Sequence, residues 1–252
     1  MTPTTAITPH NPLEGDKQEM SITLHDGAEE LVSIIIVHKD RPEYLNILLQ
    51  SIAVTSYNNN YEVIVVDNAS GPESQEFLKD IEKDVKVVKN DKNLYWSDAC
   101  NRGVSASNSS SKYFIFMHCD TVILNPAWID ILLNVVESKK SGLVGVETNA
   151  YHVGGHKVDY VQEWLMLMSR DCYTAIGGWP EKLPLIGNSF VVSIAAQNKG
   201  FGPQVVKMQI AHHYKIFAID INELERMQEA ALAVLPSLLQ KAQSQAVESK
   251  IN

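Results

Sequence analysis

The segment from residue 113 to 120 constrains the fold of this chain more than any other. It reads Tyr-Phe-Ile-Phe-Met-His-Cys-Asp, an apolar stretch that ends in the carboxylate of Asp120. A strand this apolar is typical of the centre of a parallel sheet, where both faces are covered. The end of the strand then brings Asp120 to the carboxyl edge of the sheet, which is where open α/β sheets bind their ligands.

A second strand-like run, residues 62–66, ends in the same way in Asp67. Two aspartates on one sheet edge could hold a metal–phosphate ligand and the nucleoside attached to it. The alternative is that each aspartate only caps the turn that follows its strand, as aspartate often does.

Apolar runs alternate with helical patterns up to about residue 146, which predicts an α/β fold with a doubly wound, mainly parallel central sheet and flanking helices. Asp40 is the predicted N-cap of the first helix, with a proline in its first turn. Residues 147–170 show no clear pattern. Further on we expect a short helix that ends at Gly177 and Gly178, a helix from about Ser189 to Gly200, and a strand over residues 204–211.

Length and composition favour one core. With 252 residues, of which 45% are hydrophobic, the chain can form one sizeable domain with small additions. We expect a flexible leader at 1–30, a domain at 31–220 and an amphipathic helical tail at 221–252. The tail either packs on its own domain or forms a homo-oligomer through the C-terminal helix.

Charge and cysteine content narrow the class of protein. The formal net charge of −9 argues against a nucleic-acid surface, which normally carries a basic stripe. Three cysteines without CxxC spacing favour reduced thiols over a disulfide framework or a zinc site. No apolar stretch is long enough to span a membrane, and the beginning of the chain does not have the pattern of a signal peptide. We therefore expect a cytoplasmic protein.

Several ordered segments together carry a family resemblance: residues 32–45, 65–70, 93–103, 120–128, 169–181 and 200–201. The chain is similar to the family-2 glycosyltransferases of the GT-A fold, in particular to their rhamnosyltransferase-like branch. The resemblance covers roughly residues 31–215. It implies an enzyme of the hexosyltransferase class that uses a nucleoside-diphosphate sugar as donor. The acceptor hydroxyl would belong to a glycan, a lipid-linked molecule or a protein, and Mn²⁺ or Mg²⁺ would bridge the two phosphates of the donor.

The resemblance also assigns residues to the nucleotide. Asp67 matches the carboxylate that hydrogen-bonds the nucleobase. His38 and Asp40 stand in the early motif near the base, where the family normally has Thr-Tyr-Asn. Asn101 and Gly103 match the helix that lies near the ribose and the phosphates. The alternative for Asn101 is a hydrogen bond within its helix.

The metal motif of the family is altered in this chain. Asp120 matches the last acid of the Asp-x-Asp motif, and His118 replaces the first acid. An imidazole can still ligate Mn²⁺, so the change weakens metal binding without abolishing it. His212 or His213 matches a late histidine that can complete the metal shell. The alternative for His118 is a structural residue at the end of its strand.

The largest departure concerns the general base that deprotonates the acceptor. The resemblance puts an acidic pair at positions 188 and 189, where this chain has asparagine and serine. A positioned base contributes typically 10²–10⁴-fold to such reactions. Glu181, Asp159 and Glu163 are candidate replacements. Alternatively, the enzyme retains configuration and needs no protein base, or the protein is a catalytically silent nucleotide-sugar-binding or assembly protein.

Overall fold

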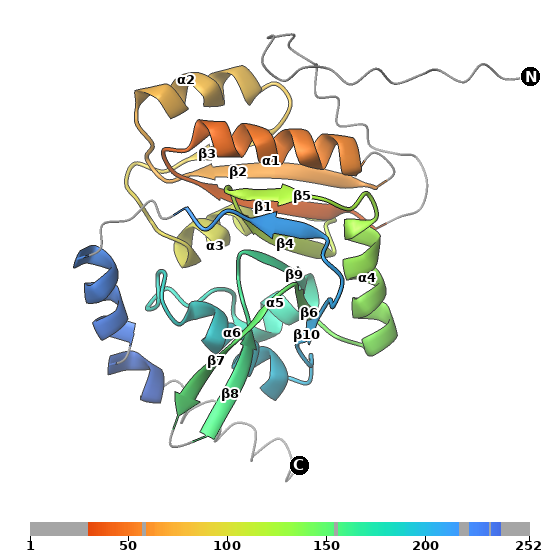
Figure 1. The fold of residues 1–252 in the computed structure, drawn as a ribbon, viewed down its shortest axis with the longest axis vertical. Coiled ribbons are helices and arrows are strands. Elements are labelled where there is room, and N and C mark those ends of the chain that lie inside the picture. The colour runs from red at the N-terminus through yellow and green to blue at the C-terminus, as the bar shows by residue number, and fades with distance from the viewer. Residues whose placement is uncertain (1–29, 57–58, 154–155, 217–221, 232, 238–252) are drawn as a thin grey trace, which may run out of the picture.

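The computed structural model describes residues 30–56, 59–153, 156–216, 222–231 and 233–237. Its centre is a seven-stranded sheet flanked by helices (Figure 1). The strands, in spatial order, are β10 (Gln204–Val205), β6 (Leu143–Gly145), β9 (Leu165–Ser169), β4 (Tyr113–His118), β1 (Val32–His38), β2 (Tyr61–Asp67) and β3 (Lys86–Lys89). The predicted α/β fold with a mainly parallel sheet is confirmed.

β1 and β4 lie side by side and parallel in the middle of this sheet. Both are almost completely buried, as a strand with both faces covered must be. Their carboxyl ends, together with that of β2, lie at one edge of the sheet. The apolar run before Asp120 therefore forms the central strand that its composition predicts.

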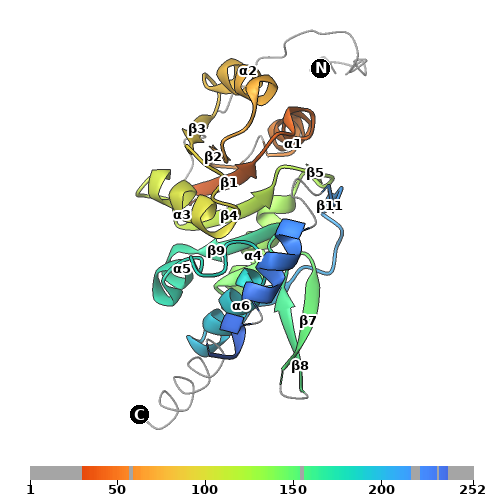
Figure 2. The ribbon, with the colours of Figure 1, turned by 90° about the vertical axis from the view of Figure 1, so that its left-hand side faces the viewer.

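Helices cover the two faces of the sheet and build separate cores. On one face, α1 (Pro42–Thr55), α2 (Pro72–Ile81) and α4 (Trp128–Lys139) contribute buried side chains such as Leu48 and Trp128. The other face carries α3 (Ser97–Ala106), α5 (Arg170–Ile176) and α6 (Asn188–Asn198). In Figure 2, α3 and α5 lie on one side of the strands and α1 lies on the other.

Residues 147–170, which show no clear sequence pattern, contain the central-sheet strand β9. β9 runs antiparallel to both of its neighbours, β4 and β6, and most of its residues are fully buried. A hairpin of β7 (Thr148–Val153) and β8 (His156–Val161) precedes it. Burial on both faces of β9 removes the alternation by which a strand is usually predicted.

The predicted strand over residues 204–211 is wrong in extent, because the structure has two short strands there. Gln204–Val205 is β10, and Ala211–His213 is β11, which pairs antiparallel with β5 (Thr121–Ile123). Gly177, in the left-handed conformation, ends α5 as predicted. α6 begins at Asn188, one residue before the position expected.

The described part of the tail is helical over residues 222–231 and 233–237. Ala231 and Leu235 are buried against Leu183 and Phe190 of the preceding segment. The apolar side of this helix thus packs within the chain, and the predicted homo-oligomer stays a prediction. Residues 1–29 and 238–252 of the predicted leader and tail lie outside the described part. None of the helices in the described ranges is long and apolar enough to cross a membrane.

Candidate metal and nucleotide-sugar site

Two adjacent strand ends bring the ligand candidates together. β4 ends at His118, and the turn that follows carries Asp120 into β5. In the antiparallel pairing of β5 with β11, His213 lies opposite Thr121, the residue after Asp120. The backbone N–H of Tyr214 also donates a hydrogen bond of 2.9 Å to the carbonyl oxygen of Asp120. This pairing explains how a histidine 93 positions away reaches the aspartate.

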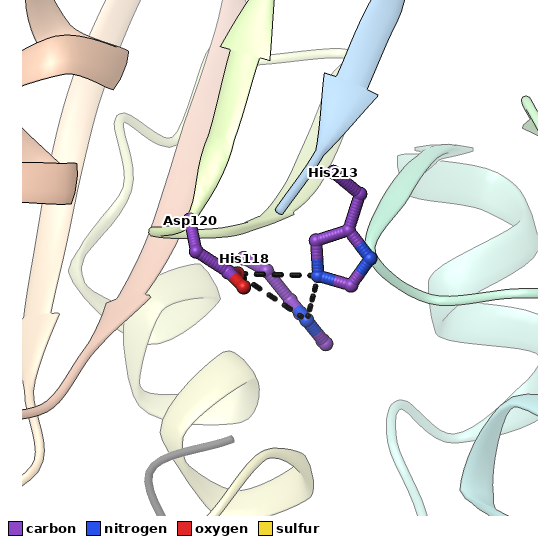
Figure 3. Close-up of side chains that lie close together, drawn as sticks. All are labelled: His118, Asp120 and His213. Carbon is purple, nitrogen blue, oxygen red and sulfur yellow. Dashed lines mark hydrogen bonds and ion pairs between the residues drawn. The ribbon is translucent and has the colours of Figure 1, made fainter. Parts of the chain in front are cut away.

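His118, Asp120 and His213 form a compact cluster (Figure 3). The Nε2 atom of His213 lies 3.2 Å from Oδ1 of Asp120 and 3.2 Å from Nδ1 of His118. The distance between Nδ1 of His118 and Oδ1 of Asp120 is 4.0 Å. In the described part of the chain, no other group of histidine, cysteine and acidic side chains has the spacing of a metal site.

The protonation states suit a metal ligand set. Burial, followed by the nearby His213, lowers the pKa of His118 to about 3, so its imidazole is neutral at pH 7. Burial alone would raise the pKa of Asp120, but the hydrogen bond with His213 and the backbone N–H of Ile216 outweigh it and lower the pKa. A neutral imidazole and an ionised carboxylate are the forms that bind a metal.

The spacing of the cluster also fits one ion. Metal–ligand bonds of about 2.1 Å place any two ligand atoms no more than about 4.2 Å apart. The three distances between the candidate ligand atoms, from 3.2 to 4.0 Å, lie within that limit. Three protein ligands leave further coordination positions for water or phosphate oxygens.

Neighbouring groups orient these ligands, as outer-shell partners do in metal sites. The Trp164 ring stacks on the His213 ring, with 5.1 Å between the centroids and an interplanar angle of 12°. Trp96 packs edge-on against His118 at 4.5 Å. The N–H of Ile216 donates a hydrogen bond of 2.7 Å to Oδ2 of Asp120, which leaves Oδ1 toward the histidines.

A cavity of about 350 Å³ opens beside the cluster, a size in the range of small-molecule sites. Its wall is mixed in character. Basic side chains from Lys39, Arg41 and Lys215 line it, and so does the Asn68 amide. Aromatic and aliphatic side chains form much of the remainder: Tyr95, Trp96, Trp164, Leu185, Ile186 and Leu224. Such a wall can hold a ligand that has an anionic part and a planar part.

Of the predicted metal ligands, the structure brings together His118, Asp120 and His213. His212 is exposed, and its ring lies edge-on to Tyr214 at 5.1 Å. Successive side chains on a strand point to opposite faces, so only one histidine of the pair can face Asp120.

The predicted nucleotide residues at the ends of β1 and β2 do not line the cavity. His38 is fully buried, and its Nε2 lies 3.2 Å from the Ser74 hydroxyl. Asp67 is also fully buried and accepts a hydrogen bond of 2.5 Å from Nε2 of Gln75. Their nucleotide-binding role stays a prediction, and the adjacent Lys39 and Asn68 line the cavity instead.

Asp40 was predicted as the N-cap of α1, and this is wrong. The N-cap is Arg41, which makes no side-chain capping bond. Asp40 has a positive φ of 50°, and its Oδ1 accepts a hydrogen bond of 2.5 Å from the N–H of Gly71. It therefore joins the β1–α1 turn to the turn before α2. Asp40 does not line the cavity, so its predicted contact with the nucleotide remains untested.

On α3, Asn101 and Gly103 have clear structural roles. The Oδ1 of Asn101 accepts hydrogen bonds from the Tyr173 hydroxyl and the Trp179 N–H, and its Nδ2 donates to the Trp179 carbonyl. These bonds leave its helix, unlike the internal bond considered above. A Cβ on Gly103 would lie 2.4 Å from Cγ2 of Ile35, so the glycine allows α3 to approach β1. Neither residue lines the cavity.

The three candidate general bases differ in exposure and in whether they line the cavity. Asp159 and Glu181 are exposed, and neither contributes to the cavity wall. Glu163 lines the cavity together with its neighbours Gln162 and Trp164. Arg41 and Lys215 also line the wall and were not predicted. The one sequence signal for them is their position within two residues of the predicted site residues Asp40 and His213.

Comparisons with known proteins bear on the family and the fold of this chain. The family model described as "Glycosyl transferase family 2" matches residues 33–187. The O-antigen biosynthesis protein RfbC of Myxococcus xanthus is 23% identical, with 67% of this chain and 16% of that protein covered. The chain thus spans about a sixth of the length of this relative.

Solved structures share the fold. A mannosyltransferase from Pyrobaculum calidifontis, PcManGT, in complex with GDP-Man and Mn²⁺, has a TM-score of 0.64 at 12% identity, covering 90% of this chain and 68% of that one. TarS 1-349 of S. aureus in complex with UDP-GlcNAc has a TM-score of 0.57 at 14% identity, covering 81% and 66%. The matched family model and the GT-A fold of these neighbours lead to one conclusion: this chain belongs to glycosyl transferase family 2.

Proposed function

We propose that this protein transfers a sugar from a nucleoside-diphosphate sugar to an acceptor hydroxyl, and that His118, Asp120 and His213 hold a divalent cation at the diphosphate of the donor. The observation that carries the proposal is the three-residue cluster, whose ligand atoms all lie within 4.8 Å of one another beside the cavity. PcManGT, which has the same fold, is described in complex with GDP-Man and Mn²⁺.

The cavity supports a donor of this chemistry. Lys39, Arg41 and Lys215 supply positive charge for phosphate oxygens, and arginine can do so in a bidentate manner. Tyr95 and Trp96 offer flat apolar surfaces for a base or a sugar ring. The overall charge of the chain is −9, so this basic group is a local feature of the site.

The residues of the site act on the leaving group. When the sugar leaves, a nucleoside diphosphate with additional negative charge remains, and a bound cation would stabilise that charge. Asp120 and the two imidazoles would fix the position of the cation, and Trp164 would keep the His213 ring in place. Stabilisation of charge that develops only during transfer raises the rate more than it raises the affinity for the donor.

The ligand types favour Mn²⁺ over Mg²⁺. Mg²⁺ prefers oxygen ligands, whereas two of the three side chains here offer imidazole nitrogen. We therefore expect Mn²⁺ to support donor binding at concentrations at which Mg²⁺ does not.

A thermal-shift panel tests the proposal. UDP, GDP, dTDP and CDP are each added with Mn²⁺, with Mg²⁺ or with EDTA. At least one nucleotide should raise the melting temperature with Mn²⁺ and not with EDTA, and Asp120→Ala should abolish this rise. If no nucleotide shifts the melting temperature in the presence of Mn²⁺, the proposal is wrong.

A catalytically silent donor-binding protein is the second candidate. It is favoured by Asn188 and Ser189, which stand where the family resemblance puts an acidic pair and which are both buried. Incubation with the nucleoside-diphosphate sugars that bind separates the two functions. Release of nucleoside diphosphate supports the enzyme, and binding without any release supports the silent protein.

A further inference from the structure

The first turn of α6, which follows the cavity-lining residues Leu185 and Ile186, has no acidic group. Asn188 and Ser189 form its first turn. The Asn188 Oδ1 accepts a hydrogen bond of 2.5 Å from the Ser189 N–H, and its Nδ2 lies 3.4 Å from the Ser97 hydroxyl. An amide and a hydroxyl cannot accept a proton from another hydroxyl at neutral pH. A direct displacement at the anomeric carbon therefore needs a base from elsewhere.

A carboxyl group from another part of the chain reaches this position. Glu163 lies in the segment between β8 and β9, and its side chain forms a hydrogen bond with the side chain of Ser189. It lines the same cavity as His118 and Asp120. Glu163 also interacts electrostatically with His213, which lines the same cavity.

The segment around Glu163 is held on both sides. The Gln162 N–H donates a hydrogen bond of 3.0 Å to the Glu147 carbonyl, and the Trp164 indole N–H donates one of 2.8 Å to the Glu147 carboxylate. The Trp164 carbonyl accepts a hydrogen bond of 3.0 Å from the N–H of His118. Glu163 thus stands between Gln162, which is bonded to Glu147, and Trp164, which is bonded to Glu147 and to β4. Such fixed neighbours provide the preorganisation that a catalytic group needs.

The surroundings of the carboxyl group suit proton transfer. Burial raises the pKa of Glu163, while the hydrogen bond from Ser189 and the interaction with His213 limit that rise. A base is most effective when its pKa lies near the working pH. The two other candidates, Asp159 and Glu181, are exposed and outside the cavity.

We propose that Glu163 is the general base of the transfer reaction, in place of the acidic pair that α6 lacks. This inference depends on the proposed glycosyltransferase function. The acceptor O–H gives its proton to the Glu163 carboxylate, and the oxygen lone pair forms the new bond to the anomeric carbon. The bond from that carbon to the phosphate oxygen breaks, and its electron pair leaves with the nucleoside diphosphate. Displacement of this kind inverts the configuration at the anomeric carbon.

Glu163→Gln tests the base with water as acceptor. Nucleoside-diphosphate release is measured for wild type, Glu163→Gln and the control Glu181→Gln with UDP-glucose, UDP-GlcNAc, GDP-mannose and dTDP-rhamnose. We expect Glu163→Gln to lower the rate about 10²–10⁴-fold, with the Mn²⁺-dependent thermal shift by the nucleotide unchanged, and Glu181→Gln to keep the wild-type rate. Wild-type rate in Glu163→Gln overturns the inference but leaves the proposed function intact. Absence of nucleotide binding in wild type overturns the proposed function itself.

The pH dependence of the rate distinguishes a base from a structural role. The wild-type rate should fall as the pH drops and Glu163 takes up a proton, and this fall should be absent from the residual rate of Glu163→Gln. Ser189→Ala provides a second test if Glu163→Gln does not fold. It removes a hydrogen bond that lowers the pKa of Glu163, so the acid limb of the rate profile should move to higher pH. An unchanged acid limb in Ser189→Ala overturns the inference.

Discussion

Among single residues, two histidines at strand ends have different surroundings in this protein. His38 ends β1 and His118 ends β4, the strand beside it. His118 lies in the cluster with Asp120 and His213, whereas His38 is fully buried beside Ser74 on α2. The sequence alone offers the same residue type at equivalent positions. Only the packing of the strand ends separates a candidate ligand from a core residue.

His38 should make stability depend on pH. Burial lowers its pKa from 6.5 to about 4. In the unfolded chain the imidazole takes up a proton near pH 6.5, so between pH 6.5 and 4 the unfolded state binds more protons and the free energy of unfolding falls as the pH falls. A shift of this size corresponds to roughly 3 kcal/mol in total. Urea unfolding of the metal-free protein at several pH values measures it.

The matched variants are His38→Asn and, at an exposed histidine, His212→Asn. His38→Asn should lose much of the decline in stability between pH 6.5 and 4, and His212→Asn should keep it. Equal declines in the wild type and in His38→Asn would show that His38 does not cause the pH dependence.

Among the secondary-structure elements, α3 lies unusually close to the sheet. An added Cβ on Gly103 would meet Ile35 Cγ2 at 2.4 Å and Val66 Cγ2 at 3.2 Å. We expect Gly103→Ala to lower the free energy of unfolding by about 1–3 kcal/mol, because the helix must move away from β1 and β2. Ser105→Ala, at an exposed position of the same helix, is the control for helix propensity. If urea denaturation shows Gly103→Ala to be as stable as Ser105→Ala, the close packing of α3 is wrong.

How well an element can be predicted depends on its local pattern. The strands that lead to Asp67 and Asp120 are continuous apolar runs followed by turns, so their place in the sheet and their ligand edge follow from the sequence. β9 is equally buried, but it lies in a segment of scattered histidine, glycine and tryptophan residues. Its antiparallel position between β4 and β6 depends on distant pairing that no local pattern reveals.

In the candidate site, too, some residues follow from local sequence and others depend on pairing between distant segments. Asp120 and His118 follow from the end of β4, and the late histidine pair was also expected. The choice of His213 over His212 depends on the register between β5 and β11. Among the three candidate acids, the position of Glu163 next to Ser189 depends on how β9 brings its preceding segment to α6. Pairing between distant segments decides both outcomes.

In the whole molecule, the C-terminal helix closes the side of the domain near α6. Leu235 is buried, and its side chain lies against Gly187, the residue before α6. Leu224, in the helical range 222–231, lines the cavity, and Glu223 accepts a hydrogen bond from the Tyr95 hydroxyl. The helix thus contacts both the wall of the site and the helix that carries Ser189.

Leu235→Ala tests this packing. We expect it to lower the free energy of unfolding by about 2 kcal/mol or more, because it leaves a cavity against Leu183 and Phe190. Gln228→Ala, at an exposed position of the same helix, should change the stability by less than about 0.5 kcal/mol. Equal unfolding midpoints for the two variants would contradict the packing of this helix on the domain.

Pulsed electron paramagnetic resonance of Mn²⁺ tests whether a cation is bound by His118, Asp120 and His213. With the nucleoside diphosphate that binds best, the spectrum of wild type should show couplings to the ¹⁴N nuclei of two imidazoles and to ³¹P. One ¹⁴N coupling should disappear in His213→Ala, and both should remain in His212→Ala. Mn²⁺ bound without any ¹⁴N coupling, or a spectrum that His213→Ala leaves unchanged, would contradict the assignment of His118, Asp120 and His213 as the metal site.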